Sequence, residues 1–128
     1  AYPRIGLTGD GGATYLLPRL VGLRTATEIV MQDEPIGPER AESLGLVSET
    51  VPAEDLDDRV ADVATDLASG PTWALGRTKR LLWESHDRGL PDHLAAETDA
   101  MAEATATEDY ARGLAAFPTD EEPDFTGR

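Results

Sequence analysis

Apolar residues recur with the period of an α-helix over most of this chain, and that spacing limits its possible folds more than any other feature. From Glu54 to Ser69 they lie on one side of a helix whose other side carries aspartates. Gly70 and Pro71 end that pattern, and similar patterns follow over residues 72–85, 93–105 and 108–116. The second half of the chain is therefore predicted to form short amphipathic helices followed by a polar tail.

The first half begins with a glycine-dense turn over residues 4–12 and continues into a helical pattern that reaches Met31. Asp10 stands where the N-cap of that helix is expected. Proline and glycine disfavour helix interiors, so an interruption is expected at Pro18 and a break at Gly22.

A short helix is predicted after Pro38, with Gly45 as its C-cap. Residues 46–51 then alternate weakly and form the one predicted strand. A lone strand is not stable in isolation, so this pattern indicates that partner structure is missing from a mostly α-helical chain.

The charge balance excludes several partners. One lysine and ten arginines face 25 carboxylates, which gives a net charge of -14. Nucleic acids and anionic membrane surfaces are disfavoured, because binding them requires a basic surface. Strong salt screens acidic self-repulsion, so a halophilic source is one interpretation, and an ordinary acidic protein is the alternative.

The lack of cysteine and the spacing of the histidines limit the kinds of site that the chain can form. Without cysteine the chain has no disulfide, thiolate metal site or cysteine nucleophile. His86 and His93 are separated by a glycine-proline break, so no metal site is expected and both are predicted at the surface. No apolar run approaches about 20 residues and no signal pattern is present, which favours the cytoplasm. The start without methionine, inside a segment with a structured pattern, predicts a truncated product.

One long motif and several shorter ones occur in order along the chain. Residues 5–22 are similar to the segment I-G-L-x-P-D-G-G-x-x-x-x-L-P-R-L-V-G of the crotonase (enoyl-CoA hydratase/isomerase) family. The shorter segments that resemble this family cover the rest of the chain: 26–29 (A-x-E-L), 41–47 (A-x-x-x-G-L-V), 78–82 (T-K-x-x-L), 108–117 (an acidic pair, then A-F) and 123–127 (P-x-F-x-G).

The resemblance implies a fold that is α/β in the full family, with this chain as its C-terminal half. Residues 1–52 would be the end of a β-β-α spiral core, and residues 53–128 a helical oligomerisation region. It also implies assembly into trimers or hexamers. The two backbone N–H groups that hold the thioester oxygen in this family would lie upstream of Ala1, so the chain alone is expected to be inactive.

Asp10 is the catalytic candidate that the resemblance implies, since isomerase and dehalogenase branches use an aspartate here as acid/base or nucleophile. A carboxylate can carry a proton between two carbons if it reaches both and is partly desolvated. The alternative is a helix N-cap. Tyr2 aligns with a glutamate of the hydratases and cannot replace it as a base, so simple hydration is disfavoured.

Lys79, Arg80 and Phe117 resemble positions near the acyl-CoA site and are candidates for binding CoA, which is part of the substrate, so no separate cofactor is expected. The alternatives are a solvated helix face for the two cations and helix or subunit packing for Phe117. Asp120, Glu121 and Glu122 stand where the family carries a lysine-arginine pair, a departure that disfavours conventional CoA binding.

The sequence thus predicts part of an acyl-CoA enzyme of the hydratase/isomerase type. It is most like a double-bond isomerase that stabilises an enolate and moves protons with a carboxylate. The partners expected are an acyl-CoA thioester and either further copies of the chain or a missing N-terminal half. Two alternatives are a non-catalytic half that serves only oligomerisation or interaction, and an unrelated acidic helical module.

Overall fold

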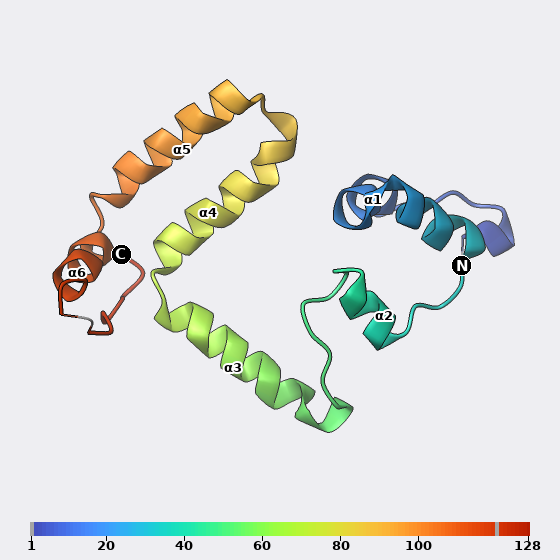
Figure 1. Ribbon diagram of the computed structural model, residues 1–128, viewed down its shortest axis with the longest axis horizontal. Coiled ribbons are helices and arrows are strands. Elements are labelled where there is room, and N and C mark those ends of the chain that lie inside the picture. Colours follow the sequence, from blue (N-terminus) through green and yellow to red (C-terminus); the bar gives the residue numbers. More distant parts are fainter. Residues whose placement is uncertain (1, 120) are drawn as a thin grey trace. The chain divides into compact units, whose positions relative to one another are not determined.

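A computed structural model describes residues 2–119 and 121–128, and these residues form helices joined by turns and loops, with no β-strand (Figure 1). The mostly α-helical prediction is therefore confirmed. The α-helices, in chain order, are α1 (Ala13–Gln32), α2 (Pro38–Ser43), α3 (Leu56–Ser69), α4 (Thr72–Glu84), α5 (Leu90–Ala104) and α6 (Glu108–Ala116). Short 3-10 turns are η1 (Pro3–Ile5), η2 (Ala53–Asp55) and η3 (Ser85–Asp87).

The chain divides into two compact units, one up to Glu54 and one from Asp55 onward. The assignment of residues 1–52 to a spiral core and of 53–128 to an oligomerisation region remains a prediction. Among the described residues, no helix is long and apolar enough to cross a membrane.

Glycines shape both ends of the first segment of α1. Gly12 caps the helix in the left-handed conformation, with φ 82°, where a side chain would be strained. Gly22 has φ 78° and ψ 155°, so the helix breaks there. The break predicted at Gly22 is therefore confirmed, whereas the helix continues through Pro18, where an interruption was also expected.

Helix α2 ends in a Schellman motif, in which two amide groups beyond the helix bond back to its carbonyls. The N–H of Gly45 donates to Glu42 at 2.9 Å, and the N–H of Leu46 donates to Ala41 at 2.9 Å. Gly45 adopts φ 71°, which only glycine takes readily. The prediction of Gly45 at this helix end is confirmed in substance, although the C-cap residue itself is Leu44.

The strand predicted over residues 46–51 is wrong. Residues 46–48 form a bend, and residues 49–52 have no regular structure. The physical reason is local, because the amide of Leu46 is bonded back to α2 and is not extended along a strand. Residues 46–51 therefore need no partner strand.

Within the second unit, α4 contacts both α3 and α5, and α4 and α5 lie side by side as a helical hairpin (Figure 1). The ion pair between Arg77 and Glu103 joins the two helices of the hairpin. The ring of Trp73 lies 5.5 Å from the guanidinium carbon of Arg77. Sequence periodicity predicted these helices to within a few residues at their ends.

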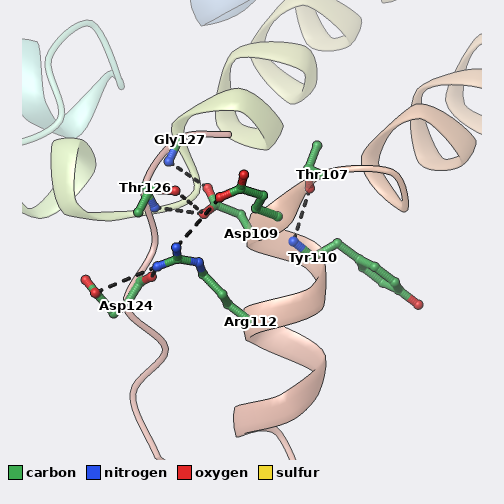
Figure 2. A network of polar contacts seen from close by, with 8 residues as sticks. Thr107, Asp109, Tyr110, Arg112, Asp124, Thr126 and Gly127 are labelled. Atoms are coloured by element: carbon green, nitrogen blue, oxygen red, sulfur yellow. Dashed lines mark hydrogen bonds and ion pairs between the residues drawn. The ribbon is translucent and has the colours of Figure 1, made fainter.

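The polar tail, predicted only as irregular chain, is fastened to α6 by Asp109 (Figure 2). One carboxylate oxygen of Asp109 accepts the N–H of Thr126 at 2.7 Å and its hydroxyl at 3.3 Å, and the other accepts the N–H of Gly127 at 2.8 Å. In return, the N–H of Asp109 donates to the carbonyl of Arg128 at 2.8 Å. The side chain of Arg112 adds a bond to the carbonyl of Asp124 at 2.7 Å.

Asp109 is buried, with 3% of its surface exposed. Burial is the largest single influence on the pKa of Asp109 and acts to raise it. The hydrogen bonds from Thr126 and Gly127, aided by the charge of Arg112, outweigh burial and hold the pKa below its ordinary value. Asp109 therefore stays ionised although it lies inside the protein.

Large apolar side chains remain widely exposed. Among the described residues, Ala26 is the one hydrophobic residue that is buried, with 4% of its surface exposed. The most exposed large apolar side chains come from both units: Ile5 (72%), Leu23 (74%), Met31 (73%), Leu90 (70%), Met101 (69%) and Phe117 (86%). A chain of this length normally buries more apolar surface, so much of its core surface is left uncovered by the described residues.

Candidate active site

Asp10 lies in the loop between η1 and α1, and its residue is exposed. Its backbone carbonyl, not its carboxylate, accepts the N–H of Ala13 at 3.0 Å. The N-cap of α1 is Gly12, and no side chain caps this helix. The alternative interpretation of Asp10 as an N-cap is therefore wrong, and its carboxylate is available for another role.

Tyr2, which the resemblance aligned with a glutamate of the hydratases, has a pKa that responds to Asp10. A hydrogen bond from the Tyr2 hydroxyl to the Asp10 carboxylate, together with the negative charge of Asp10, raises the pKa of Tyr2. A phenol in this state remains protonated and acts as a donor.

Arg4, two residues after Tyr2, contacts the end of α1. Its Nη2 donates to the carbonyl oxygen of Asp33 at 3.0 Å, and its Nε lies 3.0 Å from Oδ2 of the same aspartate. Asp33 is the C-cap residue of α1. The two residues are 29 positions apart, and sequence reasoning found neither of them.

The two predicted CoA-binding cations differ in their surroundings. Both lie on α4, but Nε of Arg80 is 2.7 Å from Glu84, and this hydrogen bond, followed by the charge of Glu84, raises the pKa of Arg80. Arg88 approaches the other oxygen of Glu84 at 2.6 Å. Among the described residues Lys79 makes no side-chain hydrogen bond or ion pair, so its charge is the more available of the two.

Apolar grooves flank these residues in the second unit. Lys79 lines one of about 440 Å³ with Leu67, Leu75 and Trp83, on α3 and α4. Phe117 lines another of about 370 Å³, whose other rings are those of Trp73, Tyr110 and Phe125. The predicted binding residues Lys79 and Phe117 therefore line two different grooves.

The histidines behave differently from each other. His86 is exposed, as predicted, whereas His93 is half-buried, with 15% of its side chain exposed. It lines a groove with α4, and its Nε2 lies 3.5 Å from Glu97. No group of metal-binding side chains occurs among residues 2–119 and 121–128.

The acidic segment that replaces the family's lysine-arginine pair is partly described. Asp120 lies outside the described residues, whereas Glu121 and Glu122 are exposed. Neither glutamate has an ion pair with a described residue, so the negative charge of this segment is not neutralised there.

Comparison with known proteins shows which family the sequence matches. The profile of the family described as Enoyl-CoA hydratase/isomerase matches residues 1–128. A protein named "Probable enoyl-CoA hydratase" from Rhodobacter capsulatus is 37% identical over 128 residues, which are all of this chain and 50% of that protein. The 1,2-epoxyphenylacetyl-CoA isomerase of Escherichia coli is 32% identical over the same length, 49% of its own.

A solved structure agrees with these sequence comparisons. The enoyl-CoA hydratase/isomerase from Cupriavidus metallidurans matches with a TM-score of 0.92 and 35% identity over 99% of this chain and 48% of its own. The chain belongs to the enoyl-CoA hydratase/isomerase family, which confirms the resemblance of its motifs. It spans about half the length of the relatives that it matches.

Proposed function

We propose that this chain is the C-terminal portion of an acyl-CoA enzyme that moves a carbon-carbon double bond, with Asp10 as the proton carrier. The observation that carries the proposal is the state of Asp10. Its carboxylate takes no part in capping α1 and projects from the glycine loop that matches the family motif. The reaction class follows from this carboxylate and from its neighbour Tyr2.

In the proposed reaction the Asp10 carboxylate removes a proton from C2 of a 3-enoyl thioester and returns it at C4. The double bond moves to C2–C3, and no atom is gained or lost. Between the two steps the negative charge rests on the thioester oxygen as an enolate, which backbone N–H donors would stabilise. The resemblance assigns those donors to the portion of the fold upstream of this chain.

Tyr2 favours isomerisation over hydration in this proposal. Hydration needs a second carboxylate to orient and deprotonate water, and a phenol with a raised pKa cannot act as that base near neutral pH. Relatives carry names of both kinds, including an isomerase at 32% identity and a 2,3-dehydroadipyl-CoA hydratase at 32%. The residues, and not these names, support the isomerase assignment.

The exposure of Asp10 also supports an incomplete site. A carboxylate base works best when partly desolvated, and the described residues leave Asp10 exposed. The missing cover and the oxyanion donors would come from an N-terminal half, so the chain alone is proposed to be inactive. Further copies of the chain, as a trimer or hexamer, are proposed as additional partners.

Lys79, Arg80 and Phe117 remain proposed contacts for the CoA portion. Lys79 is the better candidate of the two cations, because Glu84 compensates much of the charge of Arg80. The exposed ring of Phe117 is suited to an apolar or aromatic contact. The acidic Glu121 and Glu122 oppose phosphate binding nearby, and high salt would weaken that repulsion.

The second candidate function is a non-catalytic half that serves oligomerisation or interaction. The exposed apolar side chains of the second unit favour it, namely Leu82 (66%), Met101 (69%), Leu114 (59%) and Phe117 (86%). Such a surface is expected to be covered in the working assembly under either function.

Complementation separates the two functions. We would co-produce the chain with the upstream half of the Rhodobacter capsulatus relative and follow conversion of a 3-enoyl-CoA to its conjugated isomer. The proposal expects turnover that falls by at least about 100-fold in Asp10→Asn, because a neutral amide cannot accept the proton. Asp58→Asn, at an exposed position on α3, is the matched control and should retain turnover.

Turnover that survives Asp10→Asn would refute the role of Asp10. An assembled but inactive complex, with both halves folded, would instead support the non-catalytic function.

A further inference from the structure

The groove of about 440 Å³ on α3 and α4 has the form of a small-molecule site. Such sites have mostly apolar walls and a few polar or charged groups that fix the ligand. Leu82 is 66% exposed and Trp83 62%, so apolar surface is open to a ligand. The residues that line the groove are Leu67, Thr72, Leu75, Gly76, Thr78, Lys79, Leu82 and Trp83.

The charge of this groove is opposite to that of the chain. Among the described residues that line it, Lys79 is the one with a charge, although the chain has 25 carboxylates and a net charge of -14. Neither the ammonium group of Lys79 nor the hydroxyl of Thr78 has a hydrogen bond to a described residue. Both groups are donors, so a carboxylate complements them and a cationic group does not.

Gly76 keeps the groove open beside this lysine. It lies inside α4, where glycine is less favourable than alanine, and three residues before Lys79, which places both on one side of the helix. A Cβ on Gly76 would have no atom within 4 Å. The space that a larger side chain would fill is therefore left free.

We propose that this groove binds an alkyl carboxylate of the fatty-acid class, with the alkyl chain on the leucines and Trp83 and the carboxylate on Lys79. The site belongs to the second unit, whereas Asp10 belongs to the first, and it carries out no reaction. Lys79 is also a proposed contact for the CoA portion, so the two ligands would exclude each other. A free single chain is the occupant, because the acidic protein repels anionic lipid surfaces.

Calorimetric titration of the chain with decanoate, in about 0.15 M salt and below the micelle concentration, tests the proposal. Each methylene that is fully buried tightens binding by about fourfold, and about twofold is expected in a groove open to solvent. Decanoate should therefore bind at least about tenfold more tightly than hexanoate. Decyltrimethylammonium has the same alkyl chain with a positive charge and should bind more weakly than decanoate.

Two substitutions locate the ligand. Gly76→Leu should weaken decanoate binding by at least about tenfold, because leucine fills the open space, and it should retain the helix. Lys79→Gln should weaken binding by about fivefold. Arg80→Gln removes the same charge from the next residue, which does not line this groove, and is the matched control with almost unchanged binding.

Equal affinity for decanoate and hexanoate, or for the anion and the cation, would overturn the proposal. Unchanged binding in a helical Gly76→Leu chain, shown by circular dichroism, would do the same. If Gly76→Leu does not fold, Leu82→Asp at an exposed position should abolish binding, whereas Leu114→Asp on α6 should not. Because no turnover is measured, the result is independent of the proposed reaction.

Discussion

Substitution of Gly127 tests most directly how the C-terminal tail is held against the helices. It adopts φ 75°, and a Cβ at this position would lie 2.4 Å from Oγ1 of Thr72, at the start of α4. Its N–H donates to the buried carboxylate of Asp109 on α6. The substitution Gly127→Ala therefore disturbs a point where the tail meets two helices.

The expected cost has two parts. An alanine in the left-handed conformation costs about 1–2 kcal/mol relative to glycine. The contact with Thr72 adds about 0.5–1.5 kcal/mol if the threonine side chain leaves its preferred rotamer, and more if the tail must shift. Gly127→Ala should thus destabilise the second unit by about 2–3 kcal/mol.

Urea unfolding followed by tryptophan fluorescence measures this cost, because Trp73 and Trp83 are the only tryptophans and both lie on α4. With a slope of roughly 2 kcal/mol per molar, the midpoint should fall by about 1 M. Gly76→Ala is the control. Gly76 lies inside α4 with open space around it, so the same chemical change should raise stability by about 0.5–1 kcal/mol.

The two substitutions are expected to change the stability in opposite directions. If Gly127→Ala unfolds at the same urea concentration as the parent, Gly127 does not pack against Thr72 in solution. If both alanine variants are destabilised alike, added side-chain bulk and not backbone conformation governs the second unit.

Three further predictions follow from the charged and apolar residues. Asp109 has a lowered pKa, so its contribution is present above its ordinary pKa of 3.8 and is lost as the pH falls through its lower folded value. Urea midpoints measured against pH should show this loss in the parent, whereas Asp109→Asn should be less stable at pH 7 and lose less on acidification. Glu84→Gln removes the partly exposed ion pairs with Arg80 and Arg88 and should leave the midpoint almost unchanged in molar salt. If the exposed Phe117 ring contributes to self-association, Phe117→Ser should weaken it in sedimentation velocity without loss of helix.

Helices could be predicted from the sequence because their signals are local. Residues 108–116 were predicted as a helix and form α6 with the same bounds, where the Thr107 hydroxyl caps the N–H of Tyr110 at 3.1 Å. Proline and glycine likewise marked the boundary before α4. Such features depend on residues three or four apart, which a single sequence displays.

The predicted strand and the predicted N-cap were wrong because backbone hydrogen bonds and glycine conformations, which the local patterns did not reveal, determine the structure at both places. Alternation over residues 46–51 suggested a strand, but the amide of Leu46 completes the end of α2. Asp10 stood two residues before Gly12, which takes the N-cap position in a conformation that glycine adopts readily. In both cases glycine at positive φ decides the path of the chain.

The candidate site likewise contains one residue that the sequence could indicate and contacts that it could not. Asp10 could be named from a motif, and its role remains a prediction. The influence of Asp10 on the pKa of Tyr2 and the hydrogen bond from Arg4 to Asp33, 29 positions away, both depend on how the chain folds back on itself. No periodicity links such residues, so only tertiary structure brings them together.

Two of the short motifs gain a physical explanation from the tail. The acidic pair that ends at Asp109 and the segment Pro123–Gly127 were matched as separate strings, yet the carboxylate of Asp109 binds the amides of Thr126 and Gly127. The ring of Phe125 also lies 3.6 Å from where a Cβ on Gly113 would be, which is an ordinary packing distance, so the tail packs against α6 at this glycine as well. Each string is the binding partner of the other, and loss of the tail amides would leave the buried charge of Asp109 without its contacts.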